Sequence, residues 1–263
     1  LYSSLSEIND NVLLFPMDDF LTSEALAISP DLELNRLSTL EDSLNSKHIV
    51  ICNLMGYLRY LPNVNTYKNS FISLKKGDQI DLDEFKEKLY SLGYKRDSVV
   101  NNTGEMALRG FIVDLFPLEF ANPVRLEFFG DEIDSIRFFD AETQLSIEDI
   151  DNIIIKPCTE FITFSTVENS DFSKQKYLPL YEKVNSIYDY LDDNITIFKN
   201  YEQLELSYNN LYKQCEEYKR EKDIDFKSDY MFSFNSINPT FKLFYMNINN
   251  IKNDLISDVV DYN

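Results

Sequence analysis

The apolar positions of the first 67 residues predict alternating helices and strands. Ser29-Pro30 supplies a helix cap followed by proline at the first helical position. A short apolar run at 48–52 predicts a buried strand, and 54–61 predicts a helix that ends before Pro62. The apolar stripe after the cap has helical spacing and consists of Leu34, Leu37, Leu40 and Leu44. A helix, strand, helix series of this kind favours a parallel sheet.

Residues 68–146 form a second unit that opens with a strand and a helix. The strand is predicted at 71–74, and Lys76-Gly77-Asp78 is the turn after it. Asp81 and Glu84 have the spacing of a capping box, with Asp in the place of Ser or Thr. Gly93 ends the helix, whose apolar face is made of Leu82, Phe85, Leu89 and Leu92.

Three strand-like runs complete this unit. In the run 106–116 the alternation changes phase across Arg109-Gly110, which predicts a bulge at the glycine. The run 123–129 alternates without interruption, and Gly130-Asp131 turns the chain into the third run, 133–139. One helix with antiparallel hairpins predicts a small α+β domain.

From residue 147 the pattern returns to α/β. It predicts a strand at 152–156, a helix over 177–191, a buried strand at 195–198 and a long helix over 201–221. The long helix carries a stripe that is more typical of a core face than of a ligand platform, namely Leu204, Tyr208, Leu211, Cys215 and Tyr218.

The amino-acid composition argues against several classes of function and site. The formal net charge of −20 argues against nucleic-acid binding by this chain, because that binding is mainly the neutralisation of phosphates by Lys and Arg. The three cysteines are widely spaced, which favours reduced thiols over a disulfide framework or a zinc site. His48 is the only histidine, and a structural role suits it better than a catalytic one. No apolar run approaches the roughly 20 residues needed to cross a bilayer.

Motifs for common active sites are missing from the sequence. There is no phosphate-binding loop, no dinucleotide fingerprint, no nucleophile elbow and no zinc-protease motif. Acidic pairs such as Asp18-Asp19, Asp131-Glu132 and Asp192-Asp193 fit caps and turns better than a catalytic pair. We therefore assign no catalytic residue and no cofactor or metal site. The chain begins with Leu1 rather than Met, so we expect it to be part of a longer protein.

The second unit carries a distinctive string of motifs. It runs through Gly93-Tyr94-Lys95-Arg96-Asp97, Gly104-Glu105-Met106-Ala107-Leu108-Arg109-Gly110, Val113-Asp114-Leu115-Phe116-Pro117 and the stretch from Val124 to Arg137. In order, spacing and residue types, this string resembles the UvrA-binding domain shared by UvrB and the family of transcription-repair coupling factors.

Two flanking stretches favour the coupling factors over UvrB. Both Phe15-Pro16-Met17-Asp18-Asp19-Phe20 and the stretch 53–62 resemble the degenerate first domain of coupling factors. In this region UvrB carries a tyrosine-rich hairpin that it inserts between DNA strands. The chain from Phe15 to Pro30 contains no tyrosine and leaves no room for that hairpin.

The resemblance implies a set of residues that bind UvrA. They are Arg96, Arg109, Arg125 and Glu127, with Phe116 as an additional candidate. Ala107 lies where UvrB has a further arginine, so one UvrB-type contact is absent. Arg125 and Glu127 alternate with apolar neighbours and so share one strand face. Exposed cross-strand ion pairs are the alternative for these two residues, and a place in the core is the alternative for Phe116.

The fold expected is α/β: a degenerate RecA-like (P-loop-type) parallel-sheet domain interrupted by a small α+β UvrA-binding domain. The expected segments are 1–67, 68–146 and 147–263. We expect docking on UvrA through a face that holds both Arg96 and Arg125, in competition with UvrB. The resemblance also implies that the parent masks this surface with its own C-terminal end.

The resemblance implies a cytoplasmic bacterial parent that acts in nucleotide excision repair. The parent would bind stalled RNA polymerase, translocate on DNA with ATP and Mg, and hand the lesion to UvrA. This chain would be its non-catalytic adaptor, with RNA polymerase and DNA bound by other domains. One alternative is a fragment of the UvrB damage-verification helicase. Another is an acidic hydrolase, which would place two carboxylates opposite each other in a cleft.

Overall fold

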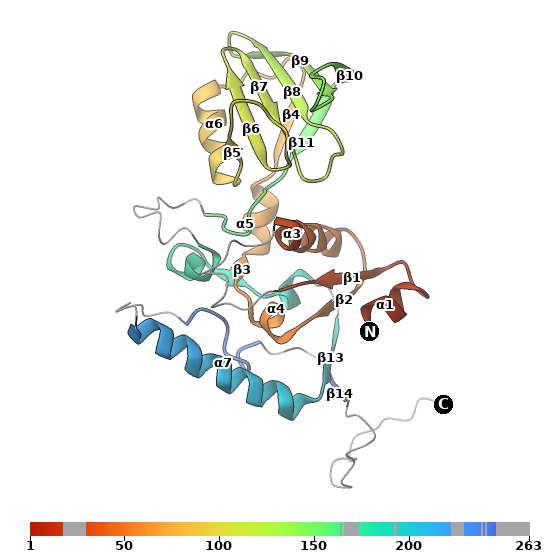
Figure 1. Ribbon diagram of the computed structural model, residues 1–263, viewed down its shortest axis with the longest axis vertical. Helices are drawn as coiled ribbons and strands as arrows, with labels where there is room; N and C mark the ends of the chain where they lie inside the picture. The colour runs from red at the N-terminus through yellow and green to blue at the C-terminus, as the bar shows by residue number, and fades with distance from the viewer. Residues whose placement is uncertain are drawn as a thin grey trace.

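The chain folds into a larger unit and a small domain that stands on it (Figure 1). Helix α1 (Tyr2–Ser6) begins the larger unit, and α5 (Val64–Asn69) leads from it into the small domain. The computed structural model describes residues 1–17, 30–163, 165, 174–191, 194–221, 229–237, 239 and 241–245.

The first parallel strand pair of the larger unit confirms a strand at 48–52, but not its predicted burial: Ile49 is 44 % exposed and the other residues of β2 are only partly buried. Strands β1 (Val12–Phe15) and β2 (Ile49–Cys52) pair in parallel, and α3 (Pro30–Asn45) connects them. Parallel neighbours need a crossover of this kind, which an amphipathic helix supplies by burying one face on the strands. In α3, Leu37 and Leu40 are buried. The cap predicted at Ser29 lies outside the described residues.

The helix predicted over 54–61 is wrong in its second half. Helix α4 (Leu54–Leu58) is capped by Asn53, whose side chain accepts a hydrogen bond of 2.8 Å from the Gly56 backbone nitrogen. The backbone is extended at the C-cap, and β3 (Leu61–Pro62) follows. Proline disfavours a helical conformation in the residue before it, so the proline shortens the helix rather than merely ending it.

The single helix predicted over 177–191 is also wrong. Two short 3₁₀ helices, η2 (Gln175–Leu180) and η3 (Ile187–Tyr190), stand there, separated by β12 (Val184–Asn185), which pairs with β3. Pro179 lies inside η2, and Ser186 begins η3 with a capping box. Pro179 interrupts helical hydrogen bonding, and the capping box at Ser186 begins a new helix. The continuous apolar pattern is therefore divided between two short helices.

A second parallel strand pair lies in the C-terminal part of the larger unit. Strands β13 (Ile195–Lys199) and β14 (Phe241–Tyr245) are parallel, and α7 (Tyr201–Glu221) follows β13 with the predicted bounds. The predicted α7 stripe packs in the main core, whereas β13 is buried only at Phe198. Ile197 is 64 % exposed, so the prediction of a buried strand is wrong for the outer face of β13.

The small domain begins with the predicted strand and helix. Strand β4 (Ile72–Lys75) pairs with β11 (Asn152–Ile155), and α6 (Leu82–Ser91) follows β4. The Asp81 side chain accepts hydrogen bonds of 2.9 Å from two backbone nitrogens of the first turn, which confirms the predicted cap. Gly93 ends the helix with a φ of +88°, as a C′ glycine does.

A six-stranded sheet forms the body of the small domain. Its strand order is β10-β9-β8-β7-β6-β5, with only β5 and β6 parallel. One face packs with α6 around a second apolar core, which also takes in β4 and β11. The strands are β5 (Lys95–Arg96), β6 (Glu105–Arg109), β7 (Ile112–Leu115), β8 (Val124–Phe129), β9 (Glu132–Phe139) and β10 (Ser146–Ile150). Strand β10 begins at Ser146 and β11 lies beyond it, so both strands pack with this domain although the segment expected for it ends at residue 146.

The bulge predicted at Arg109-Gly110 is a hairpin turn instead. Arg109 and Ile112 are paired in register, which leaves Gly110 and Phe111 as a two-residue loop. Gly110 has a φ of +63°, as the first loop residue of a type II′ turn requires. In a two-residue hairpin the residues that flank the loop share a face although they are three positions apart, so the alternation changes phase as it does at a bulge. The sequence pattern is therefore the same for both.

Among the described residues, no helix combines the length and the apolar composition needed to cross a membrane.

Candidate functional site

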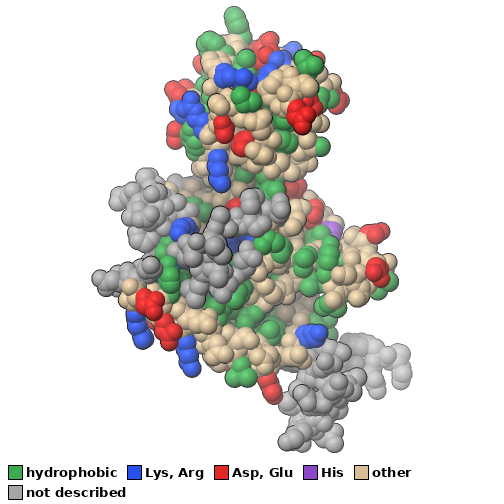
Figure 2. Space-filling view, viewed as in Figure 1, with side chains coloured by type: hydrophobic (Ala, Val, Ile, Leu, Met, Phe, Trp, Pro, Cys, Tyr) green, Lys and Arg blue, Asp and Glu red, His purple; other side chains and the backbone are tan. Residues whose placement is uncertain are grey.

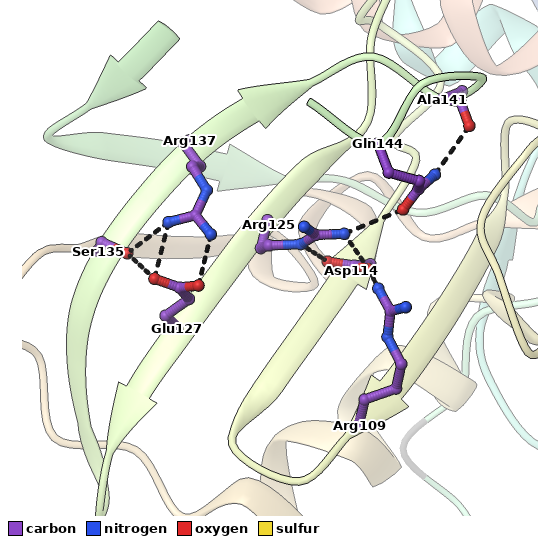
Figure 3. A network of polar contacts seen from close by, with 8 residues as sticks. All are labelled: Arg109, Asp114, Arg125, Glu127, Ser135, Arg137, Ala141 and Gln144. Carbon is purple, nitrogen blue, oxygen red and sulfur yellow. Dashed lines mark hydrogen bonds and ion pairs between the residues drawn. The ribbon is translucent and has the colours of Figure 1, made fainter. Parts of the chain in front are cut away.

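On the sheet face turned away from α6, five charged residues of four neighbouring strands are joined by ion pairs. Strand β8 alternates as predicted: three of its apolar side chains enter the second core, whereas its charged side chains and the exposed Phe129 lie on the opposite side. Figure 3 shows the arrangement, and Figure 2 shows side chains of both charge signs over the small domain. We call this set the charged face; it consists of Arg109, Asp114, Arg125, Glu127 and Arg137.

Asp114 is the centre of the charged face. It lies on β7, between the strands that carry Arg109 and Arg125, and it is 0 % exposed. Its carboxylate accepts hydrogen bonds from Arg125 Nε at 2.6 Å and from Arg125 Nη2 at 2.9 Å, and Arg109 Nη2 also donates to it. A buried carboxylate is costly unless it is paired, so Asp114 holds both arginines beside it.

Arg125 is fixed by three kinds of contact. Besides Asp114, its Nη2 donates to Gln144 Oε1 at 3.1 Å, and its guanidinium lies 4.3 Å from the centre of the Phe139 ring. Gln144 is itself held by a 2.8 Å hydrogen bond to the Ala141 carbonyl. The Arg125 side chain is only 13 % exposed, against 45 % for Arg109. Arg109 is therefore the more accessible cation of the pair.

Glu127 and Arg137 make a second ion pair across β8 and β9. Arg137 Nη1 donates to Glu127 Oε2 at 2.7 Å, Arg137 Nη2 donates to Oε1, and Ser135 Oγ donates to Oε2 at 2.9 Å. The hydrogen bonds from Arg137 hold the pKa of Glu127 below its ordinary value. Glu127 therefore stays an acceptor across the neutral range.

Three of the predicted UvrA-binding residues lie together. Arg109, Arg125 and Glu127 share the charged face, and each is also in an ion pair within the chain. The cross-strand ion pairs weighed as the alternative are thus present, but they are half-buried and networked rather than fully exposed. Pairing fixes these side chains in place without hiding Arg109.

Arg96 does not share this face. Strand β5 pairs Arg96 with Met106 and Lys95 with Glu105. Met106 is buried in the core on the α6 side, and partners in a parallel ladder point to the same side. The expectation of one face holding both Arg96 and Arg125 is therefore wrong. Arg96 is exposed, and its part in binding stays a prediction.

Phe116 is 9 % exposed and packs with Val100, Ala107 and Ala141 in a small apolar cluster. This is the core position weighed as the alternative, and a binding role for Phe116 stays a prediction. Two aromatic residues that the sequence analysis did not select are exposed instead. Phe111 and Phe129, 60 % and 85 % exposed, lie at neighbouring turns at one end of the sheet, where the Phe128 nitrogen donates to the Phe111 carbonyl.

Three further residues of the contact network are absent from the predicted set of binding residues: Asp114, Arg137 and Gln144. The signal for Asp114 was present, because it is the one charged residue within the otherwise apolar strand 112–115. Arg137 follows from the alternation of β9 once its register with β8 is known. No local pattern points to Gln144, which reaches Arg125 from the turn after β9 with a positive φ of 60°.

A second charged group joins the two units. Glu160, on the segment after β11, is 2 % exposed. It accepts hydrogen bonds from Arg36 Nε at 3.1 and 3.0 Å, and from Arg59 at 3.0 and 2.6 Å. Burial alone would raise the pKa of Glu160, but the two guanidinium groups outweigh it and lower the pKa to about 2. The carboxylate thus binds the second connection to the larger unit.

Glu160 lies near a second carboxylate, Glu33, but it is buried between two arginines. Burial, and then the charge of Glu160, raise the pKa of Glu33, so two carboxylates with separated pKa values do lie near each other. Both oxygens of Glu160 are nevertheless taken by Arg36 and Arg59, away from solvent. Within the described ranges, no group of three or more His, Cys, Asp or Glu side chains is placed to hold a metal ion.

Comparison with known proteins identifies the small domain. Residues 72–161 match the model of the UvrB interaction domain, and this match contains the whole charged face. The relatives include the transcription-repair-coupling factors of Staphylococcus aureus (strain bovine RF122 / ET3-1), 41 % identical over 149 residues, and of Staphylococcus epidermidis (strain ATCC 12228 / FDA PCI 1200), 39 % identical over 160 residues. These matches cover 56 % and 60 % of this chain, but only 13 % and 14 % of the relatives. The resemblance to coupling factors is confirmed.

Proposed function

We propose that this chain, a relative of the N-terminal part of transcription-repair-coupling factors, is the part of such a protein that recruits UvrA through the charged face. The observation that carries the proposal is the network of Arg109, Asp114 and Arg125 inside the matched domain. Burying a carboxylate beside two arginines costs desolvation free energy. A surface that binds no partner would gain nothing from this arrangement.

The charged face suits a polar protein surface. Arg109 offers guanidinium donors, and a planar fork of this kind recognises carboxylates. Glu127 offers acceptor oxygens on the same face as these donors. The face therefore presents charges of both signs, which would favour one orientation of a docked partner. The exposed ring of Phe129 lies on the same strand as Arg125 and Glu127, and exposed aromatic residues often anchor interfaces.

The larger unit would be a support for this domain. We propose that it is a degenerate RecA-like domain: β1-α3-β2 and β13-α7-β14 are both parallel strand pairs with a helix between them. The adaptor itself would be non-catalytic. Binding of stalled RNA polymerase and ATP-driven translocation on DNA would belong to other parts of the bacterial, cytoplasmic parent.

Two alternatives were weighed. A fragment of UvrB would share the small domain, but the relatives quoted above are coupling factors and extend beyond that domain on this chain. A carboxylate hydrolase finds no support in the Glu33 and Glu160 pair, because Glu160 is enclosed by two arginines.

The proposal is tested by calorimetric titration of the full chain and its variants into purified UvrA. Arg109→Ala should weaken binding by roughly 1.5–3 kcal/mol, the range for a hydrogen bond to a charged group, while Asp114 keeps Arg125 as its partner. Lys213→Ala, an exposed change on α7, is the matched loss of one cation and should leave affinity unchanged. Equal binding by all three proteins would remove the charged face from the interface.

Arg96→Ala belongs in the same titration, because it separates the two sides of the sheet. A loss with Arg96→Ala and none with Arg109→Ala would move the contact to the β5 edge. No binding by the folded wild-type chain would contradict the proposed function.

A further inference from the structure

Asp114 presents no surface of its own to a partner. It is 0 % exposed, so any effect that it has on docking must pass through the side chains that it contacts. Those side chains are Arg109 and Arg125, which reach it from the strands on either side. Figure 3 shows both guanidinium groups turned toward the one carboxylate.

Two neighbouring guanidinium groups repel each other and have many rotamers. A free arginine side chain carries about 2 kcal/mol of rotamer entropy, which a partner must offset when it fixes the side chain. The Asp114 carboxylate removes the repulsion and fixes both groups before any partner arrives. Preorganisation of this kind improves affinity by lowering the ordering cost of binding.

The hydrogen-bond geometry leaves donors for a partner. Arg125 uses Nε and Nη2 within the chain, and Arg109 uses only Nη2. Arg125 Nη1 and the Nε and Nη1 atoms of Arg109 make no hydrogen bond to any described residue. Because Arg109 is 45 % exposed, its Nε and Nη1 atoms, which point in different directions, are accessible as separate hydrogen-bond donors.

Resting on the proposed function, we infer that Asp114 is the positioning residue of the charged face: it fixes Arg109 and Arg125 so that their remaining donors bind a carboxylate of the partner. A positioning role and a purely electrostatic role for Asp114 predict opposite changes in affinity when its negative charge is removed. Asp114→Asn removes one negative charge from the face, which would tighten a contact with a carboxylate that is governed by net charge alone. If Asp114 acts by positioning, the same change weakens the contact, because a neutral amide holds the two cations less strongly.

The test is calorimetric titration of full-length chain variants into UvrA. We expect Asp114→Asn to weaken binding on the order of tenfold. The control is Val113→Ala, the adjacent residue of β7, which is 0 % exposed in the core on the other side of the sheet. It should lower stability and leave affinity unchanged. Unchanged or tighter binding by Asp114→Asn overturns the inference, and so does an equal loss with Val113→Ala.

Gln144→Ala keeps the test decisive if Asp114→Asn does not fold. It removes one restraint on Arg125 without touching the buried charge, and it should weaken binding by a smaller factor. Full affinity in Gln144→Ala would overturn the inference in that case. Absence of wild-type binding overturns the proposed function and the inference with it, whereas wild-type binding with an insensitive Asp114 variant overturns the inference alone.

Discussion

At the residue scale, the direction of each charged side chain on the sheet is set by its own strand, and its ion-pair partner is set by the pairing with a neighbouring strand. Arg125 and Glu127 share a face because strand alternation is local, and it could be read from the sequence. The partners of these residues depend on register between strands: Asp114 faces Arg125 only through the pairing of β7 with β8. Phe116 was selected and is in the core, whereas the exposed Phe129 was not selected.

The two phenylalanines should respond oppositely to truncation. Phe129→Ala removes a ring that is 85 % exposed, so it should leave stability nearly unchanged and weaken binding to UvrA. Phe116→Ala empties a buried site and should cost about 3 kcal/mol of unfolding free energy. Urea denaturation and titration into UvrA measure the two effects. Stability loss with Phe129→Ala, or none with Phe116→Ala, would reverse the assignment.

At the element scale, predictions held where one period dominated and failed where a turn interrupted it. Helix α7 and strand β8 have long, unbroken patterns and were predicted with correct bounds or nearly so. The hairpin at Gly110 cannot be distinguished from a bulge by its sequence pattern, because both shift the alternation phase. The 3₁₀ helices near Pro179 were joined into one helix because their apolar spacing continues across the break.

Glycine substitutions test the turn assignment. Gly110 has a φ of +63° and open space around it, so Gly110→Ala should cost about 1 kcal/mol from backbone conformation alone. Gly93→Ala should cost more, because a Cβ there would lie 2.7 Å from Thr159 Cβ in addition to the positive φ. Thermal unfolding of both variants gives the comparison. A neutral Gly110→Ala would argue against the type II′ turn.

At the scale of the whole molecule, the connection between the two units depends on contacts that no sequence spacing reveals. Glu160 bonds to Arg36 and Arg59, which lie 124 and 101 residues away in the chain. The larger unit also contributes Glu41, which pairs with Lys156 at the same connection. The fold class could be predicted from local patterns, but the way that one unit is fixed on the other could not.

The Glu160 group predicts a pH dependence of stability. Its pKa is lowered from 4.5 to about 2 in the folded chain, so its contribution is fully present above pH 4.5 and is lost as pH falls toward about 2. Glu33, with a raised pKa, opposes this trend in part. Urea denaturation of the wild type and Glu160→Gln across this window should show a weaker pH dependence in the variant. Equal pH slopes would contradict the prediction.

The most direct test of the account is a titration of the full chain into UvrA in the absence and in the presence of UvrB. If the charged face recruits UvrA as the UvrB interaction domain would, the chain should bind UvrA alone, and its apparent affinity should fall as the UvrB concentration rises. Absence of binding, or binding that UvrB does not weaken, would contradict the account.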